Sequence, residues 1–359
     1  MNDIKNKKIM LSGGGTGGSV TPLLAVASKY LEMNPKVEFV FVGTKKGPEK
    51  KMVRQWGGDM RFISMTSGKL RRYASLANIL DIFKITWAFF QSFIILSKER
   101  PSIIISAGSF VSVPLVWAAG IMKVPVLIHQ QDVRPGLANK LMAKIAKTIT
   151  VTFEESIQDY GKKAVWIGNP IKEIGQRDGS EIRKRYNLER NKDIVLIIGG
   201  GTGAVGINKL VASGVDSILE NRQVVHLTGK NKDNSVDRQG YHSFSFLPHK
   251  EVIDLITIAD VVVSRCGLGV LTELSLLRKA SILIPIPKSH QEDNANLFKD
   301  YKAALVLNQL DLTGKSLALY LNKVLGDKEL LFKLKNNISK PIKRGASEKM
   351  IEIIENIIK

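Results

Sequence analysis

Apolar and polar positions follow the same scheme in two successive blocks of the chain. Short runs rich in Ile and Val, apolar on both faces, alternate with longer amphipathic stretches. Strands that are apolar on both faces are typical of parallel sheets covered by helices on each side. The pattern therefore predicts an α/β protein with two Rossmann-like, doubly wound domains.

The expected elements can be placed from this pattern. In the first block we expect strands at 8–12, 37–42, 61–65, 102–106, 125–129, 148–153 and 165–168, and helices at 20–33, 46–56, 74–98, 110–121 and 135–146. In the second block we expect strands at 194–198, 224–227, 244–247, 261–264, 282–286 and 304–307, helices between them, and a last helix at 345–358. The polar segment GNPIKEIGQRDGS, 168–180, is the expected linker. Domains are thus expected at 1–168 and 169–344.

Each block opens with a strand that runs into glycines, GGGTGG at 13–18 and GGGTGAVG at 199–206. Both contain the spacing of a dinucleotide fingerprint. That fold also needs a carboxylate at the end of its second strand, where these blocks have Gly43–Thr44 and Thr228–Gly229. The loops therefore favour phosphate binding by backbone N–H groups over dinucleotide binding, and tight turns without a ligand stay open as the alternative.

Charge and composition narrow the classes of function. The formal net charge is +20, of which +13 lies in residues 1–168. Such an excess favours an anionic partner, which is nucleic acid, an acidic lipid or a phosphorylated substrate, unless it reflects a generally basic proteome. No helix-turn-helix, zinc or aromatic-strand signature supports nucleic acid. The single Cys266 excludes an internal disulfide, and the apolar run at 9–11 is too short for a signal peptide or an anchor.

The segment VVVSRCGLGVLTELSLLRKASILIPIPKSHQEDNANLF, 261–298, is the most informative. It predicts a strand, a glycine turn and a helix whose start, at Gly267 and Gly269, suits a diphosphate. Glu273 lies one turn further on, where it could bind ribose hydroxyls, although a solvated helical Glu is the ordinary alternative. The polar groups that follow, able to bond sugar hydroxyls, are His290, Gln291 and Asn294.

An apolar helix is expected within 67–96. One face carries Ile79, Leu80, Phe83 and Trp87, and the basic residues Lys69, Arg71 and Arg72 precede it. Polar residues interrupt the apolar run, which disfavours a membrane span and favours a helix lying in the interface of an anionic membrane. A core helix that packs under the sheet remains the alternative.

Together these motifs resemble the MurG family of peptidoglycan glycosyltransferases over nearly the whole chain. The resemblance includes SGKLRRY (67–73), FVSVP (110–114), GLANK (136–140), GNPIK (168–172), HLTGK (226–230) and DNANLF (293–298). It implies a GT-B fold, two domains facing across a cleft, with the last helix, 345–359, packed back on the first domain. It further implies a peripheral enzyme at the cytoplasmic face of the cell membrane that works beside other cell-wall synthesis proteins.

The activity implied is inverting transfer of N-acetylglucosamine from UDP-N-acetylglucosamine to the polyprenyl-diphosphate-linked acceptor lipid I, which forms lipid II, without metal or cofactor. The chain lacks the Asp–x–Asp pair that holds a divalent ion in metal-dependent glycosyltransferases. A related enzyme that uses a UDP-sugar on another lipid or glycan is the alternative, and a non-catalytic binding protein is a further one.

The resemblance also implies roles for individual residues. Leu247 would meet uracil through its backbone, Glu273 the ribose, and His290, Gln291 and Asn294 the N-acetylglucosamine. The donor diphosphate would lie against Leu268, Gly269 and Val270, near Gly200, Gly201 and Lys172. The acceptor diphosphate would lie against the first glycine loop, at Gly14, Gly15, Thr16, Gly17 and Gly18.

The chain departs from the family's pattern on the acceptor side. Ser19 stands where the family usually has His, 129–132 reads HQQD where it has His–Glu–x–Asn, and 108–110 reads GSF where it has Gly–Gly–Tyr/Phe. A serine hydroxyl is a poor base near neutral pH, so His129 and Asp132 are the expected candidates for the catalytic base. A structural, hydrogen-bonded His129 and a helix-capping Asp132 remain open as alternatives.

Overall fold

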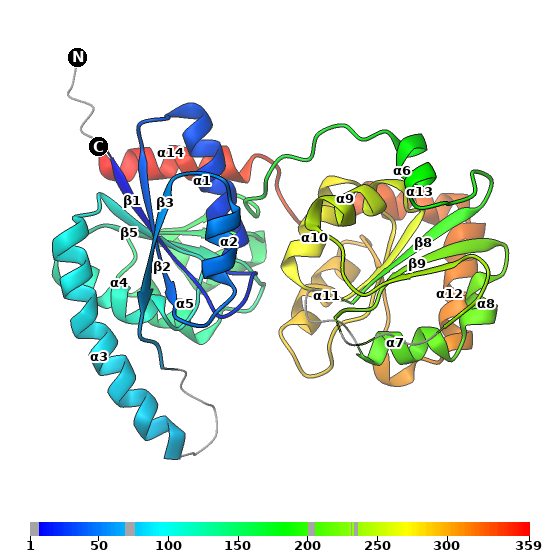
Figure 1. Cartoon of the computed structure of the whole chain (residues 1–359), viewed down its shortest axis with the longest axis horizontal. Coiled ribbons are helices and arrows are strands. Elements are labelled where there is room, and N and C mark those ends of the chain that lie inside the picture. Colours follow the sequence, from blue (N-terminus) through cyan, green and yellow to red (C-terminus); the bar gives the residue numbers. More distant parts are fainter. Residues whose placement is uncertain (1–6, 69–75, 200–204, 231, 233–235) are drawn as a thin grey trace. The chain divides into compact units, whose positions relative to one another are not determined.

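The structure is a computed structural model that describes residues 7–68, 76–199, 205–230, 232 and 236–359, without the side chains of 76–80. It forms two compact units (Figure 1). Unit 1 comprises Met1–Lys172 and Lys343–Lys359, and unit 2 comprises Glu173–Ile342. We describe each unit by itself.

Unit 1 is built on a parallel seven-stranded sheet with the order β3-β2-β1-β4-β5-β6-β7. The order reverses between β1 and β4, and such switch points are where open α/β sheets bind ligands. The first glycine loop follows β1 at this point. The strands are β1 (Lys8–Ser12), β2 (Glu38–Thr44), β3 (Met60–Met65), β4 (Ile103–Ser106), β5 (Val126–Gln130), β6 (Thr148–Val151) and β7 (Ala164–Trp166).

Helices cover both faces of this sheet (Figure 1). Ile9 and Leu11 of β1 point into one apolar cluster with α1 and α14, whereas Met10 points into the other, with α3, α4 and α5. The C-terminal helix α14 thus belongs to the core of unit 1. The helices are α1 (Thr21–Met33), α2 (Glu49–Gln55), α3 (Leu76–Glu99), α4 (Ser112–Ile121), α5 (Leu137–Ala143) and α14 (Ala346–Ile358), with 3-10 turns η1 (Glu154–Asp159) and η2 (Gly161–Lys163).

Unit 2 repeats the same scheme, with a parallel sheet of order β10-β9-β8-β11-β12-β13. Val195 and Ile197 of β8 pack with α7, α8, α12 and α13, and the alternate residues Ile194 and Leu196 are equally buried. The strands are β8 (Asp193–Ile198), β9 (Arg222–Leu227), β10 (Tyr241–Phe244), β11 (Val261–Ser264), β12 (Ser281–Leu283) and β13 (Leu305–Val306). The helices are α6 (Gly179–Arg185), α7 (Val205–Ala212), α8 (Val215–Leu219), α9 (His249–Ile258), α10 (Leu268–Leu276), α11 (Gln291–Asp300), α12 (Gly314–Gly326) and α13 (Lys328–Asn337), with a 3-10 turn η3 (Gln309–Asp311).

The two parallel-sheet α/β units are the fold class that the sequence predicts, and the expected strands are present. Two predictions are wrong by three residues: the strand expected at 244–247 is β10, Tyr241–Phe244, and the strand expected at 282–286 is β12, which ends at Leu283. The register of the edge strand β10 is set by Tyr241, which is buried and pairs its hydroxyl with Nδ1 of His226 on β9 at 2.7 Å. Leu247 therefore lies beyond the strand, in the short segment between β10 and α9.

Candidate functional site

The first glycine loop is closed by Ser19, which stands at the position of the family's usual His. The Ser19 hydroxyl accepts a hydrogen bond from the Gly14 N–H at 3.1 Å. It lies 3.2 Å from the Gly14 carbonyl oxygen and 3.4 Å from that of Thr16, either of which can accept its proton. Ser19 is buried, so its hydroxyl fixes the shape of the loop.

A buried carboxylate supports the same loop from the interior of unit 1. Glu49, fully buried at the start of α2, accepts hydrogen bonds from the N–H of Gly15 at 3.2 Å and of Thr44 at 2.6 Å, and from the Thr44 hydroxyl. A side chain at any of three glycines would overlap that of Glu49, and these are Gly14, Gly43 and Gly47. The carboxylate is turned inward and unavailable to a ribose, which agrees with the sequence argument against a dinucleotide site.

These contacts separate into two groups the five loop residues that the family resemblance assigns to the acceptor diphosphate. The N–H groups of Gly14 and Gly15 donate to side chains of the chain itself. Within the described residues, no intramolecular acceptor is recorded for the N–H groups of Thr16, Gly17 and Gly18, which immediately precede the first turn leading into α1. Consecutive N–H groups before a helix are suited to an anion, and these three form the usable part of the predicted site.

His129, at the end of β5, is enclosed in the core. It is fully buried, with Nδ1 3.1 Å from the Thr150 hydroxyl and Nε2 3.1 Å from Oδ1 of Asn169. Burial lowers the pKa of the imidazole to about 4. The structure thus favours the structural interpretation of His129 that the sequence left open, because a sealed, neutral ring has no access to an acceptor hydroxyl.

Gln130, where the family's pattern has Glu, uses both ends of its amide. Its Oε1 accepts from Nδ2 of Asn139 at 2.7 Å and from the Tyr160 hydroxyl at 2.9 Å. Its Nε2 donates to the carbonyl oxygens of Asp132, at 2.7 Å, and Arg134, at 3.4 Å. A glutamate carboxylate could accept hydrogen bonds here but not donate them. The amide therefore holds the loop after β5 in place.

Asp132 lies in this loop and is partly exposed. The interpretation of Asp132 as the cap of the following helix is wrong, because α5 begins at Leu137 and its N-cap is Gly136. Of the two predicted bases, Asp132 is the residue that is partly exposed, whereas His129 is fully buried.

In unit 2, the helix start predicted for a diphosphate is α10. Its N-cap is Gly267 in an extended conformation, and the first intrahelical bond runs from the Leu271 N–H to the Gly267 carbonyl oxygen at 3.2 Å. The N–H groups of Leu268, Gly269 and Val270 therefore have no acceptor within the helix. A Cβ at Gly269 would meet no atom within 4 Å, so the helix start is open.

Glu273 lies in the second turn of α10, with its side chain 11% exposed. Its Oε1 is 2.8 Å from Nε2 of His249, the first residue of α9. Hydrogen bonding to Glu273 raises the pKa of the His249 imidazole. His249 follows Leu247 by two residues in the sequence. One short segment therefore carries both the residue predicted to meet uracil and the hydrogen-bond partner of Glu273, the residue predicted to meet the ribose.

Gln291 and Asn294, at the start of α11, both bind the backbone of Cys266 just before the α10 turn. Oε1 of Gln291 accepts from the Cys266 N–H at 3.2 Å and the Ile286 N–H at 3.3 Å. Nδ2 of Asn294 donates to the Cys266 carbonyl oxygen at 3.1 Å. The structure thus brings these two predicted sugar-binding residues to the turn that starts α10. His290 is exposed at the N-cap of α11.

Arg265 is a buried cation beside this turn that the sequence analysis did not single out. It donates to the carbonyl oxygens of Ile284 at 3.0 Å and Pro285 at 3.1 Å, and to Oε1 of Gln309 at 2.5 Å. Burial lowers the pKa of its guanidinium. Its position in the sequence, between the end of an apolar strand and the glycine turn, could have indicated Arg265 as a residue of this region.

Several of the predicted site residues lie wholly or partly outside the described part of the structure. Gly200 and Gly201 lie outside the described residues, as do Lys69, Arg71 and Arg72. Ile79 and Leu80 belong to α3, but their side chains are outside the described part. Lys172 is exposed at the end of the first stretch of unit 1. Within the described residues, no three His, Cys, Asp or Glu side chains gather as a metal site.

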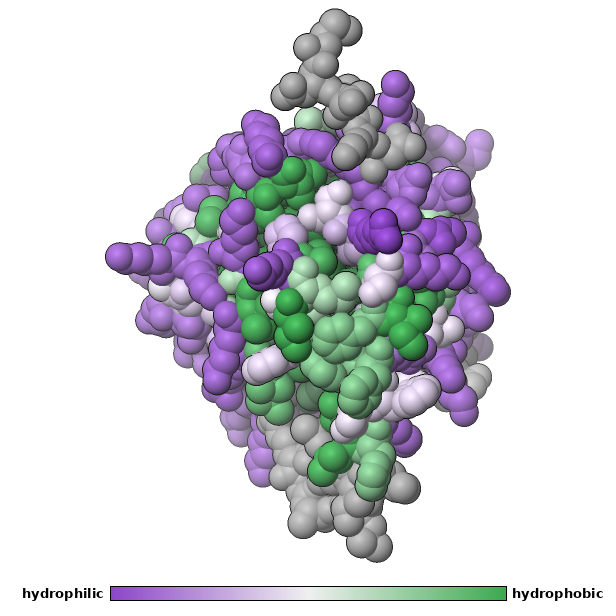
Figure 2. Space-filling model, turned by 90° about the vertical axis from the view of Figure 1, so that its left-hand side faces the viewer, coloured by the Kyte–Doolittle hydropathy of each residue, from purple (hydrophilic) through white to green (hydrophobic). Residues whose placement is uncertain are grey.

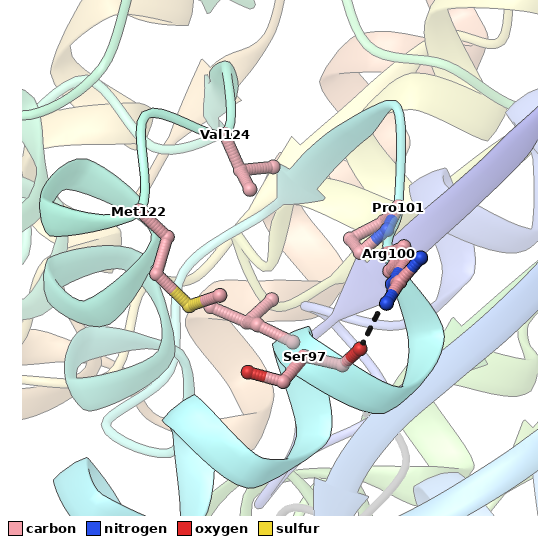
Figure 3. Close-up of a pocket in the computed structure, with 6 residues that line it drawn as sticks. Ser97, Arg100, Pro101, Met122 and Val124 are labelled. Carbon is pink, nitrogen blue, oxygen red and sulfur yellow. Dashed lines mark hydrogen bonds between the residues drawn. The ribbon is translucent and has the colours of Figure 1, made fainter.

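A groove of about 350 Å³ lies in unit 1 at the amino-terminal ends of strands β4 and β5 (Figure 3). It is formed where α3 leads into β4 and α4 into β5, and Arg100 Nε lies 3.4 Å from the Ser97 carbonyl oxygen in it. The groove thus lies at the amino-terminal ends of the parallel strands, whereas the glycine loop follows the carboxyl-terminal end of β1. The groove is therefore separate from the candidate site.

A large apolar surface lies on α3 and α4 of unit 1. Figure 2 shows apolar residues gathered in one area on this side of the molecule. The exposed side chains include Phe83, 70% exposed, and Trp87, 62% exposed. The others are Ile82, Phe90, Ile94, Trp117 and Ile121. The core-helix interpretation thus fails for Phe83 and Trp87, and it holds only for residues on the opposite face of α3, such as Ala88, Ile95 and Leu96, which pack inward. None of the described helices is long and apolar enough to cross a membrane.

Comparison with known proteins identifies close relatives. The model of the glycosyltransferase family 28 N-terminal domain matches residues 9–151, and that of the family 28 C-terminal domain matches residues 194–350. A UDP-N-acetylglucosamine–N-acetylmuramyl-(pentapeptide) pyrophosphoryl-undecaprenol N-acetylglucosamine transferase of Clostridium botulinum (strain 657 / Type Ba4) is 36% identical over 98% of this chain and 100% of its own. The protein of the same name from Staphylococcus aureus (strain bovine RF122 / ET3-1) is 36% identical over 88% of this chain and 90% of its own.

Solved structures support the fold. The crystal structure of Acinetobacter baumannii MurG superposes with a TM-score of 0.75 at 22% identity and covers 98% of this chain and 99% of its own. A UDP-GlcNAc 2-epimerase from Neisseria meningitidis, solved with UDP-GlcNAc bound, gives a TM-score of 0.69 at 12% identity over 98% and 100% of the two chains. At these identities the likeness concerns the fold, and it confirms the GT-B class expected from the sequence.

Proposed function

The chain belongs to the family of UDP-N-acetylglucosamine–N-acetylmuramyl-(pentapeptide) pyrophosphoryl-undecaprenol N-acetylglucosamine transferases, and we propose that it catalyses the same transfer. In this reaction N-acetylglucosamine moves from UDP-N-acetylglucosamine to lipid I and gives lipid II. The observation that carries the proposal is that Gln291 and Asn294 bind the backbone of Cys266 beside the glycine turn that starts α10, the helix that carries Glu273.

We propose that unit 2 binds the donor. The carboxylate of Glu273 is a natural acceptor for the two ribose hydroxyls, and charge-assisted hydrogen bonds of this kind are strong. The open N–H groups at Leu268, Gly269 and Val270 would meet the diphosphate, where the helix dipole favours negative charge. Gln291 and Asn294, with His290, would read the sugar, and the Leu247 backbone would meet uracil.

The leaving group determines what the chemistry needs. Inverting transfer breaks the bond between the anomeric carbon and the diphosphate while the acceptor oxygen attacks from the opposite face. The departing UDP gains charge, which the N–H groups at the start of α10 and a cation such as Lys172 would stabilise. This role requires no metal ion, and Gly200 and Gly201 are proposed to add backbone contacts near the same phosphates.

The acceptor hydroxyl must lose a proton as it attacks. We propose Asp132 for this step, because its carboxylate is partly exposed while His129 is sealed and Ser19 is bound into the glycine loop. The N–H groups of Thr16, Gly17 and Gly18 are proposed to hold the acceptor diphosphate.

The acceptor's polyprenyl chain remains in the bilayer, so the enzyme must work at a membrane surface. We propose that the apolar surface on α3 and α4 docks there, at the cytoplasmic face, and that other cell-wall synthesis proteins act beside it. Lys84, Lys98, Arg100 and Lys123 lie on or next to these two helices and add positive charge. Anionic lipids attract such residues.

Turnover of radiolabelled UDP-N-acetylglucosamine with a lipid I analogue tests the function. We expect a labelled disaccharide lipid with lipid I and none with diacylglycerol, and the same rate with excess chelator. Transfer to diacylglycerol instead would assign the chain to another lipid acceptor, and donor binding without any transfer would make it a binding protein.

A further inference from the structure

His249 contacts the residue that the proposed function assigns to the donor ribose. The Nε2–Oε1 distance to Glu273 is 2.8 Å, and this is the hydrogen bond that the structure records for the Glu273 carboxylate within the described residues. The His249 side chain is 64% exposed, whereas that of Glu273 is 11% exposed. The histidine thus contacts a largely buried carboxylate while its own ring remains exposed.

The backbone around His249 is firmly held. Pro248, with φ of −56°, precedes it as the N-cap of α9, and two residues further on Glu251 accepts a hydrogen bond from the Tyr186 hydroxyl at 2.8 Å. The helix then buries Ile253 and Leu255 in unit 2. Figure 1 shows α9 and α10 next to each other. The imidazole is therefore presented to Glu273 from a fixed helix start.

A carboxylate that receives a vicinal diol must hold one orientation. When Oε1 of Glu273 is bound by His249, the side-chain torsions are restricted and Oε2 is left for the ligand. Binding sites gain affinity when such partners fix the residue that touches the ligand, since less side-chain entropy is then lost on binding. Exposed ion pairs often contribute nothing measurable, so the effect must be sought at the ligand.

We propose that His249 is a positioning residue for the donor: it orients the Glu273 carboxylate toward the ribose hydroxyls and so increases affinity for uridine nucleotides. This inference rests on the proposed function, because it assumes that Glu273 binds the ribose. It assigns a role to a residue that lies outside the sequence motifs of the family described above.

The test measures binding of UDP by calorimetry and the KM and kcat of UDP-N-acetylglucosamine. His249→Ala should weaken UDP binding and raise the donor KM about three- to tenfold, as expected for one hydrogen bond, with kcat unchanged. His249→Gln keeps a side-chain N–H donor and should restore most of the affinity. Lys250→Ala, at the exposed neighbouring position, is the matched control and should bind UDP like the unaltered protein.

A double-mutant cycle separates positioning from general damage. In a Glu273→Ala background, His249→Ala should have no further effect on UDP binding, because the group through which it acts is gone. The His249→Ala penalty should also shrink for 2′-deoxy-UDP. An equal penalty in both backgrounds, or wild-type UDP affinity in His249→Ala, overturns the inference while leaving the ribose assignment intact. If Glu273→Ala alone binds UDP like the unaltered protein, the ribose assignment fails and this inference fails with it.

Discussion

The buried carboxylate of Glu49 accepts a hydrogen bond from the backbone N–H of Gly15, so the first glycine loop is held by an anion of the chain itself. In a dinucleotide fold the acidic residue after the second strand faces the ligand. Here it faces the interior and leaves only the outer N–H groups of the loop for a phosphate. The loop is thus shaped before any ligand arrives.

Replacement of Glu49 should therefore weaken binding of the acceptor. In Glu49→Gln one carboxylate oxygen becomes an NH₂ group, which is a donor. The amide therefore has one oxygen left and loses the hydrogen bond from either Gly15 or Thr44. A lost hydrogen bond to a charged group is worth about 1.5–3 kcal/mol. We expect a higher KM for lipid I and a lower urea midpoint, with the donor KM unchanged. Glu32→Gln, at an exposed position on α1, is the control. A changed donor KM with a normal acceptor KM would contradict this role.

Asp132 and His129 should respond differently to substitution. Asp132→Asn should lower kcat by about 10²–10⁴-fold with little effect on stability, as loss of a general base does. His129→Asn should lower the free energy of unfolding, because it disturbs the hydrogen bonds to Thr150 and Asn169, while folded protein keeps most of its kcat. Steady-state kinetics and urea unfolding distinguish the two, with Asp159→Asn as an exposed control. Normal turnover in Asp132→Asn would place the base elsewhere.

Burial of neutral His129 should make the protein sensitive to acid. The folded-state pKa is about 4, below the unfolded value of about 6.5. Between these values the unfolded chain binds a proton that the folded chain does not, so stability falls as the pH falls through this window. The full effect is about 3 kcal/mol. Urea unfolding from about pH 7 to about pH 4 measures the slope, which should be smaller in His129→Asn. An NMR titration of the ring with a midpoint near 6.5 would contradict the expectation.

Ser109 should be a site of removable strain. Its φ is 95°, a region that favours glycine, and the family's pattern has Gly at this position. Ser109→Gly should raise the free energy of unfolding by about 1 kcal/mol. Thermal unfolding measures this, with Ser102→Gly as the control at a residue outside the left-handed region. A fall in melting temperature equal to that of the control would show that the backbone is unstrained.

Phe83 and Trp87 should contribute to membrane binding rather than to stability. The double variant Phe83→Ser, Trp87→Ser should bind vesicles rich in acidic lipid more weakly, because both side chains are exposed on the apolar surface. Activity on a long-chain acceptor should fall while that on a short-chain soluble acceptor is kept. Co-sedimentation and both assays test this, at low and high salt.

The control is Phe332→Ser, which removes a similarly exposed aromatic side chain from α13 in unit 2. Equal losses on the two acceptors, or a lower melting temperature in the double variant, would show that Phe83 and Trp87 serve the fold.

The parts of the fold that depend on local pattern were predictable from the sequence. Strands β1 and β11 were placed to the residue, because their apolar runs end directly at glycine or polar turns. Strand β10 was misplaced because its register depends on the buried pairing of Tyr241 with His226, which periodicity does not contain. The α10 turn with Glu273 was found because glycine and carboxylate lie close together in the sequence.

Residues whose hydrogen-bond partners lie far away in the sequence were not predicted. Glu49 reaches Gly15 over 34 positions, and His249 reaches Glu273 over 24. Both look like ordinary surface residues in the sequence, and only the folded backbone turns them toward a partner. The same holds for His129, whose structural partners Thr150, Thr152 and Asn169 lie on later segments of the chain.

The close packing around Glu49 also limits how this loop can evolve. Gly14, Gly43 and Gly47 leave no space for a side chain while Glu49 is present, and a smaller residue at 49 would remove the acceptor of the Gly15 and Thr44 N–H groups. Each of these four positions thus depends on the others, and every single-step change passes through a damaged intermediate. A laboratory selection for new acceptors should instead accumulate substitutions at the exposed positions Thr16 and Gly18, where a larger side chain meets no such obstacle.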